Sequence, residues 1–118
     1  KQEVPAGWQV TQQEQAMDGQ ALLDRLAAMA DRREALARLL RHCLLSAGAL
    51  SDTRFARSDT ERDAFARLPE NFKYHEALKT LLRDSELAHY GGRPVSEEMF
   101  AHNLELGRIL IGTGGAHA

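Results

Sequence analysis

A leucine-rich stretch between residues 36 and 47 constrains the fold more than any other feature. Its apolar residues recur at intervals of three and four, the spacing that returns side chains to one face of an α-helix: Leu36, Leu39, Leu40, Cys43, Leu44 and Ala47. Arg33, Arg38 and Arg41 fall mostly on the opposite side. A helix with such a face is stable only when that face is buried, so the stretch predicts helices packed around a common core.

The composition extends this prediction to the whole chain. Leu, Ala, Arg and Glu dominate, whereas valine occurs three times and aromatic residues make up only 6% of the 118 residues. The abundant residues favour helix, and the scarce ones are those that favour strands. The length suits one domain with one core. We therefore predict an all-α fold, a compact bundle of about five helices that begins with an antiparallel helix hairpin.

Capping signals place the first two helices. Thr11 and Glu14 have the spacing of a capping box, which starts a first helix that Gly19 can interrupt, so that its firm part is 21–30. Asp31 starts the second helix, and Gly48 is expected to end it as a left-handed cap. Because almost no residues separate the two helices, we expect a tight hairpin.

The later helices are marked by the same kind of signals. Ser58 and Glu61 form a second capping box, which opens a short third helix that Pro69 stops. A fourth helix is predicted from about residue 71 to 89, and a fifth follows the cap at Ser96. These assignments give a single helical domain over 11–111.

The two ends of the chain have a different character. Residues 1–10 contain Pro5 and Gly7 and are predicted to be an irregular lead-in or linker, and the glycine-rich residues 112–118 are predicted to be a flexible tail. Trp8 has three interpretations: it packs back on the bundle, it ends a linker, or it lies at a membrane interface. Packing is the interpretation we favour.

Charge and hydropathy exclude several classes of function. The formal net charge is −2 and no basic stripe stands out, so we expect no nucleic-acid partner. No apolar run reaches the ~20 residues that a membrane span needs, and the first five residues lack the apolar stretch of a secretory signal. The first residue is not Met, which suggests that further segments lie outside this sequence.

We find no candidate catalytic, cofactor-binding or metal-ligating residue. No two of the five histidines lie three or four positions apart on a helix. His102 has Glu98 and Glu105 at helical spacing, but an ion-paired surface is the commoner explanation of such a pattern. Phosphate loops, dinucleotide fingerprints and nucleophile elbows do not occur. Cys43 lies in the leucine stripe, and we interpret it as a buried core residue instead of a reactive thiol.

One segment resembles a known family. The residues Ala88-His89-Tyr90-Gly91-Gly92-Arg93-Pro94-Val95-Ser96-Glu97-Glu98 resemble the bacterial domain of unknown function 4129 family (DUF 4129), whose members typically read Arg-Tyr-Gly-Gly-Arg-Pro before a capped helix. His89 replaces the frequent arginine. Residues 57–62 are similar to that family's capped short helix, and 30–50 to its helix hairpin, so the resemblance covers about 18–111.

The motif has a structural rationale. Tyr90 is expected to plug the end of the helical core, and Gly91 or Gly92 to take a positive φ where the chain turns. Arg93 is expected to reach carbonyl groups at a helix C-terminus, and Pro94 to fix the entry to the last helix. Together with Ser58 and Glu61, these are structural residues.

The resemblance implies a cellular context more than an activity. Such domains follow transmembrane segments, often in transglutaminase-like proteins, and no catalytic residues are established for them. We therefore expect a non-enzymatic interaction or accessory domain with an unknown protein partner, on the cytosolic face of the bacterial inner membrane, with a membrane-spanning helix outside this sequence. The main alternative is a free-standing, helical-repeat-like adaptor that grips a peptide in an apolar groove. An enzyme or metal-dependent domain is a further alternative, which a pocket of clustered titratable groups would favour.

Overall fold

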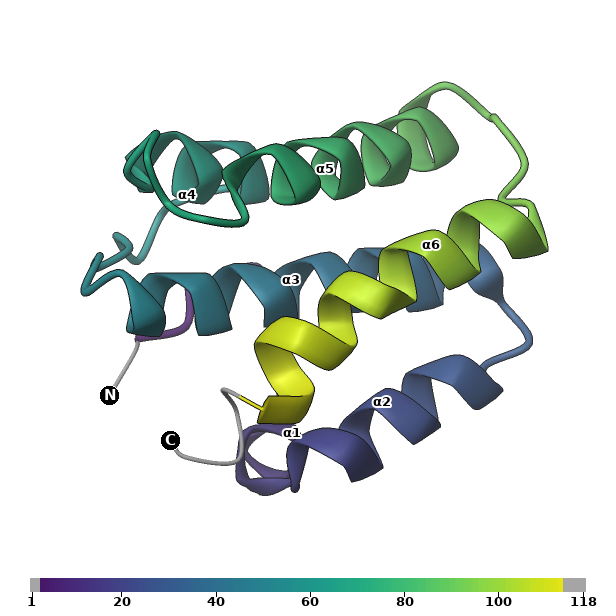
Figure 1. Ribbon diagram of the computed structural model, residues 1–118, viewed down its shortest axis with the longest axis horizontal. Helices are drawn as coiled ribbons and strands as arrows, with labels where there is room; N and C mark the ends of the chain where they lie inside the picture. The colour runs from purple at the N-terminus through teal and green to yellow at the C-terminus, as the bar shows by residue number, and fades with distance from the viewer. Residues whose placement is uncertain (1–2, 114–118) are drawn as a thin grey trace.

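The computed structural model describes residues 3–113, and within this range the secondary structure is entirely helical (Figure 1). Six α-helices are followed directly by a π-helix at Arg108–Thr113, in this order: α1 (Gln12–Ala16), α2 (Gly19–Ala28), α3 (Arg32–Leu50), α4 (Glu61–Arg67), α5 (His75–Tyr90) and α6 (Glu97–Gly107). The all-α prediction is confirmed. The predicted first helix is in fact two helices, α1 and α2.

The break between α1 and α2 has a local cause. Thr11 caps α1 in the predicted capping box with Glu14, and the helix ends at Met17 after little more than one turn. Asp18 then caps α2, because its carboxylate accepts the N–H of Ala21. Two N-caps seven residues apart leave room for only one turn before the second helix begins.

The chain begins with the short α1, where a hairpin was predicted, and the pair of helices α2 and α3 follows it. Asp31 caps α3 as expected, accepting the N–H of Glu34. The two helices run in opposite directions, and α6 crosses over them on one side (Figure 1). α4 and α5 lie on the side of α3 opposite α2 (Figure 1), and α5 also contacts α6.

The core is centred on α3, which contacts α2, α4, α5, α6 and the π-helix. All members of the predicted leucine stripe are buried: Leu36, Leu39, Leu40, Cys43, Leu44 and Ala47. Leucines from α2, α5 and α6 complete the same cluster. The periodicity of this stretch therefore identified the central helix of the domain.

The end of α3 differs from the prediction. The helix continues through Gly48, which is buried, to Leu50. Ser51 ends it, donating both its N–H and its hydroxyl to the carbonyl of Ala47, and Asp52 takes the left-handed conformation with φ 55°. The predicted glycine cap was wrong because Ser51 and Asp52 supply the capping bonds three residues further on.

The lead-in is packed on the domain. Trp8 is 2% exposed and stacks against Phe55 at 6.1 Å between ring centroids, and its indole N–H donates to the carbonyl of Asp59 at 3.1 Å. Arg41 donates to the carbonyl of Trp8. The packing interpretation of Trp8 is confirmed.

The last helical segment extends past the predicted end of the domain. Gly112 and Thr113 belong to the π-helix, so the predicted tail does not begin at 112, and its other residues lie outside the described range. Gly19 explains how this segment reaches α2: a Cβ at Gly19 would lie 2.2 Å from the carbonyl oxygen of Ile111. Only glycine permits this approach. In the part of the chain that the structure describes, no helix combines the length and hydropathy required to span a membrane.

Candidate functional site

The cap of α4 lies two residues later than predicted. Thr60 is the N-cap, accepting the N–H of Asp63, while the Asp63 carboxylate accepts the N–H of Thr60 at 3.1 Å. Ser58 is exposed and Glu61 pairs with Arg41, so neither has the predicted capping role. The sequence holds two overlapping capping patterns, and the turn at Asp59 selects the second.

That turn is fixed by the carboxylate of Asp59. It accepts the N–H of Ala56 at 2.8 Å and is held by the Arg67 guanidinium, at 2.6 and 3.1 Å. The hydrogen bond from Arg67 holds the pKa of the Asp59 carboxyl below its usual value. Because the chain is still in this turn at Ser58, the helix starts only after Thr60.

The turn after α5 agrees in part with its prediction. Gly92 has φ 67°, which confirms a positive φ at one of the two glycines. The N–H groups of Gly91 and Arg93 both donate to the carbonyl of Leu87, which are backbone bonds that do not depend on an arginine side chain at position 93. The side chain of Arg93 is exposed, as is Pro94 before the cap at Ser96.

Tyr90 was predicted to plug the core, and this was wrong. Its side chain is 84% exposed and lies edge-on to the ring of His89, with 5.4 Å between centroids. The buried face of α5 ends at Ala88, and a residue two positions further is rotated by about 200° around the helix. Tyr90 therefore points away from the core.

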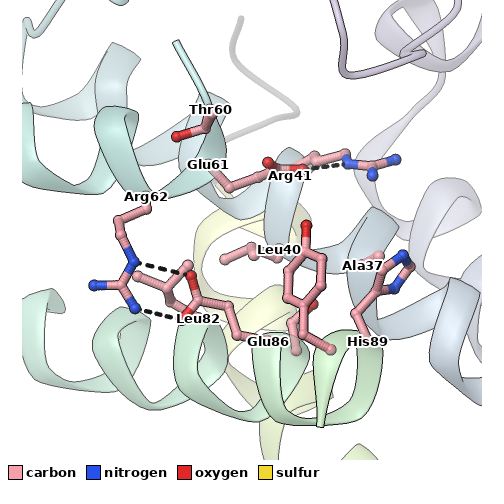
Figure 2. Close-up of a pocket in the computed structure, with 11 residues that line it drawn as sticks. Ala37, Leu40, Arg41, Thr60, Glu61, Arg62, Leu82, Glu86 and His89 are labelled. Carbon is pink, nitrogen blue, oxygen red and sulfur yellow. Dashed lines mark hydrogen bonds and ion pairs between the residues drawn. The ribbon is translucent and has the colours of Figure 1, made fainter. Parts of the chain in front are cut away.

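The exposed Tyr90 borders a cleft of about 260 Å³ between α3, α4 and α5 (Figure 2). Its residues come from all three helices: Ala37, Leu40 and Arg41 of α3, Thr60 at the cap of α4 with Glu61 and Arg62, and Leu82, Ser85, Glu86, His89 and Tyr90 of α5. Ala37, Leu40 and Leu82 are buried and form the apolar part of the lining.

Two ion pairs border the cleft (Figure 2). Arg41 Nε lies 2.8 Å from a Glu61 carboxylate oxygen and joins α3 to α4. Arg62 binds Glu86 through two nitrogens, with Nε 3.1 Å from Oε2, and joins α4 to α5. Since each carboxylate is matched by an arginine, the two ion pairs carry no net charge.

Ser85 is the polar residue in the buried part of the lining. It is only 6% exposed, and its hydroxyl has no hydrogen-bond partner among residues 3–113. In the sequence, Ser85 lies seven, four and three positions after Leu78, Leu81 and Leu82, which puts it on the apolar face of the helix predicted over 71–89. The signal in the sequence was a serine among leucines. The role of that serine can be interpreted only in the structure, where α4 leaves space beside it.

A second polar cluster is buried where α1 meets α3. Glu14 is 6% exposed, and its carboxylate accepts hydrogen bonds from Arg38 at 3.0 Å and from the N–H of Thr11 at 3.2 Å. The Nε2 of His42 lies 3.8 Å from the same carboxylate, and burial lowers the pKa of His42. Arg38 also pairs with Glu34, as its spacing predicts. Every group here faces a protein partner, so the cluster secures α1 to α3.

The remaining candidates lie apart from the cleft. His102 is exposed, as are Glu98 and Glu105, and Glu105 pairs with Arg108 at 3.1 Å. Residues 3–113 contain no group of three or more histidine, cysteine or acidic side chains placed to hold a metal ion. Cys43 is fully buried, as predicted, and burial raises the pKa of its thiol. A neutral, enclosed thiol suits a core residue.

Comparison of the chain with protein-family models, curated proteins and solved structures found no match in any of the three. The resemblance to the domain of unknown function 4129 family stays a prediction from the residues that carry it.

Proposed function

We propose that this chain is a non-enzymatic helical interaction domain on the cytosolic side of a membrane-anchored bacterial protein, and that it binds a protein partner at the cleft between α3, α4 and α5. The observation that carries the binding role is the exposed Tyr90 beside a lining that is part apolar and part ion-paired. Tyrosine is enriched in protein interfaces because a large rigid ring makes contact at low entropic cost.

The geometry of the cleft favours binding over chemistry. Ser85 and His89 lie one helical turn apart, but no hydrogen bond joins them in the described structure. A serine nucleophile needs a base at hydrogen-bond distance and a third group that orients the base. The carboxylates of the cleft are engaged with Arg41 and Arg62, which leaves none of them directed at Ser85.

The membrane context rests on the family resemblance. We expect a membrane-spanning helix of roughly 20 residues in the full-length protein, before this domain. Fractionation of the full-length protein in its host tests this. We expect it in the membrane pellet after alkaline carbonate washing, with the domain protected from protease in intact spheroplasts. Recovery of the uncleaved protein in the soluble fraction would contradict the anchor and favour the free-standing adaptor.

The binding face is tested by site-specific photocrosslinking in cells. A benzophenone amino acid at Tyr90 is expected to give discrete adducts with a partner protein. The matched control is the same substitution at Ala28, which is exposed on α2, on the other side of α3 (Figure 1). Equal adducts at both positions, or none at position 90, would remove the cleft from the proposal.

A further inference from the structure

The size of the cleft limits its occupant. Its volume is about 260 Å³, whereas pockets for cofactors and drug-sized ligands range from ~300 to ~1,000 Å³. The cleft is not enclosed and is partly open to solvent. Space of this size and shape suits one large side chain presented by another protein more than a whole small molecule.

The lining defines the body of that side chain. Leu40 and Leu82 approach the cleft from α3 and α5, with Ala37 beside them, and all three are buried. An apolar body placed against them removes apolar surface from water on both partners. The exposed ring of Tyr90 at the border adds an aromatic surface against which a second ring can pack.

Ser85 defines the tip. Ser85 is 6% exposed and its hydroxyl has no hydrogen-bond partner within residues 3–113. No side-chain polar atom in this range is both fully buried and unpartnered, so the hydroxyl keeps some contact with solvent. If a purely apolar group covered it, the hydroxyl would lose its remaining access to water without gaining a hydrogen bond, which is unfavourable. A side chain with a hydrogen-bonding group at the end of an apolar body satisfies both parts of the lining.

The border excludes strongly charged occupants. Arg41 is paired with Glu61, and Arg62 with Glu86, so neither arginine is left free to bind a phosphate or an acidic peptide. Among the natural side chains, tyrosine and tryptophan combine a large apolar ring with a polar group that needs a partner when buried. We infer that the cleft receives a single tyrosine or tryptophan side chain from the protein partner, with the Ser85 hydroxyl bonding its O–H or N–H. This inference rests on the proposed interaction role and specifies its chemistry.

Side-chain analogues test the inference directly. Titrating the 118-residue chain, labelled with ¹⁵N, with p-cresol, 3-methylindole and toluene compares tyrosine, tryptophan and phenylalanine at one site. We expect p-cresol and 3-methylindole to give saturable NMR shift changes at the amides of Leu40, Leu82 and Ser85. Toluene should bind about two- to tenfold more weakly, the factor that one neutral hydrogen bond contributes.

Two variants of Ser85 separate the contribution of its hydroxyl to binding from that of the rest of the cleft. Ser85→Ala should bring the affinity for p-cresol down to that for toluene, while the control Ser58→Ala, an exposed serine outside the lining, should leave both affinities unchanged. Ser85→Leu should fill the cleft and weaken all three ligands. Circular dichroism melting establishes that each variant is folded before it is compared.

Several outcomes would overturn the inference: no saturable binding, shift changes centred elsewhere, equal affinity for toluene and p-cresol, or an unchanged preference in Ser85→Ala. They can be told apart from failure of the proposed function, which is measured by fractionation and by crosslinking at Tyr90. Crosslinks that persist without analogue binding would leave the interaction role intact and remove only the tyrosine or tryptophan assignment.

Discussion

At the scale of single residues, Trp8 stands out because it joins the lead-in to the core of the domain. It lies before the first helix, yet it contacts Phe55, Asp59 and Arg41, which belong to the loop before α4 and to α3. We expect Trp8→Ala to lower the free energy of unfolding by about 3–5 kcal/mol, because a large buried ring is lost and a cavity remains. Urea denaturation followed by circular dichroism measures this. A loss below 1 kcal/mol would mean that the lead-in is not part of the core.

Gly92 allows a test of backbone conformation in which a new side chain meets no neighbouring atom. A Cβ would meet no atom within 4 Å at either Gly92 or Gly7, but only Gly92 has a positive φ, at 67°. Gly92→Ala should therefore cost about 1 kcal/mol of stability from backbone strain alone. Gly7→Ala is the matched control and should be close to neutral. Thermal melting of the two variants gives the comparison, and equal melting temperatures would contradict the strain.

His42 predicts a pH dependence of stability. Burial lowers its pKa in the folded state, and this outweighs the opposing effect of Glu14, while Arg38 and Arg41 lower it further. The unfolded chain therefore binds the proton more readily than the folded chain once the pH falls towards the ordinary value of 6.5. Stability that is complete well above that value is lost as the pH drops through it.

The measurement is the urea midpoint at about pH 7.5 and about pH 5.5, on either side of the ordinary histidine value. We expect the wild-type midpoint to be lower at the acidic pH, and His42→Gln to show a smaller difference between the two conditions. Asp59 and Glu97, whose pKa values are lowered by arginine partners, lose their contribution only under more acidic conditions. An identical pH response in His42→Gln would exclude His42 as the cause.

At the scale of elements, the start of α4 shows how contacts with neighbouring residues select one of two possible N-caps. Ser58 and Thr60 are both capable N-caps, and each has an acidic residue three positions later. Thr60 is used because Asp59 is turned back towards Ala56 and Arg67. The helix then places Glu61 beside Arg41 and Arg62 beside Glu86, which builds the border of the cleft.

This choice of cap has a direct test. Thr60→Ala should destabilise the protein by about 0.5–2 kcal/mol, the usual cost of removing an N-cap hydroxyl, whereas Ser58→Ala should be nearly neutral. The two variants delete one hydroxyl each, two positions apart, so the difference between their unfolding free energies isolates the cap. The reverse order of effects would restore the capping box at Ser58 and Glu61.

At the scale of the whole molecule, one core extends from the lead-in to the π-helix. Trp8 and Ile111 belong to the same cluster of buried residues, and α3 contacts nearly every other helix. The described chain has a radius of gyration of 13.0 Å, near the ~13 Å expected for about 100 residues in one domain. Loss of α2, α3, α5 or α6 would remove leucines from the core that these helices share.

We therefore expect unfolding to be a single cooperative transition. Trp8 is the only tryptophan and reports on the lead-in, while far-ultraviolet circular dichroism reports on the helices. The two urea transitions should coincide in midpoint and slope. A fluorescence transition at clearly lower urea would show that the lead-in detaches before the bundle unfolds.

The sequence alone determined the class of fold and the identity of its central helix. The leucine stripe of α3, the caps at Thr11, Asp31 and Ser96 and a left-handed glycine after α5 were all predicted and are all present. These features follow from interactions within about one helical turn, either a side-chain period or a hydrogen bond three residues away. Neighbouring residues are enough to specify them.

Tertiary structure decided the features that depend on a distant partner. α3 passes through Gly48, Tyr90 faces away from the core, and Thr60 caps in place of Ser58. The cleft depends on three helices far apart in sequence, and its unpartnered Ser85 has meaning only because α4 leaves space beside α5. Periodicity identifies which residues turn inward on one helix, but the atoms that face them come from other helices, whose positions are set by packing of the whole core.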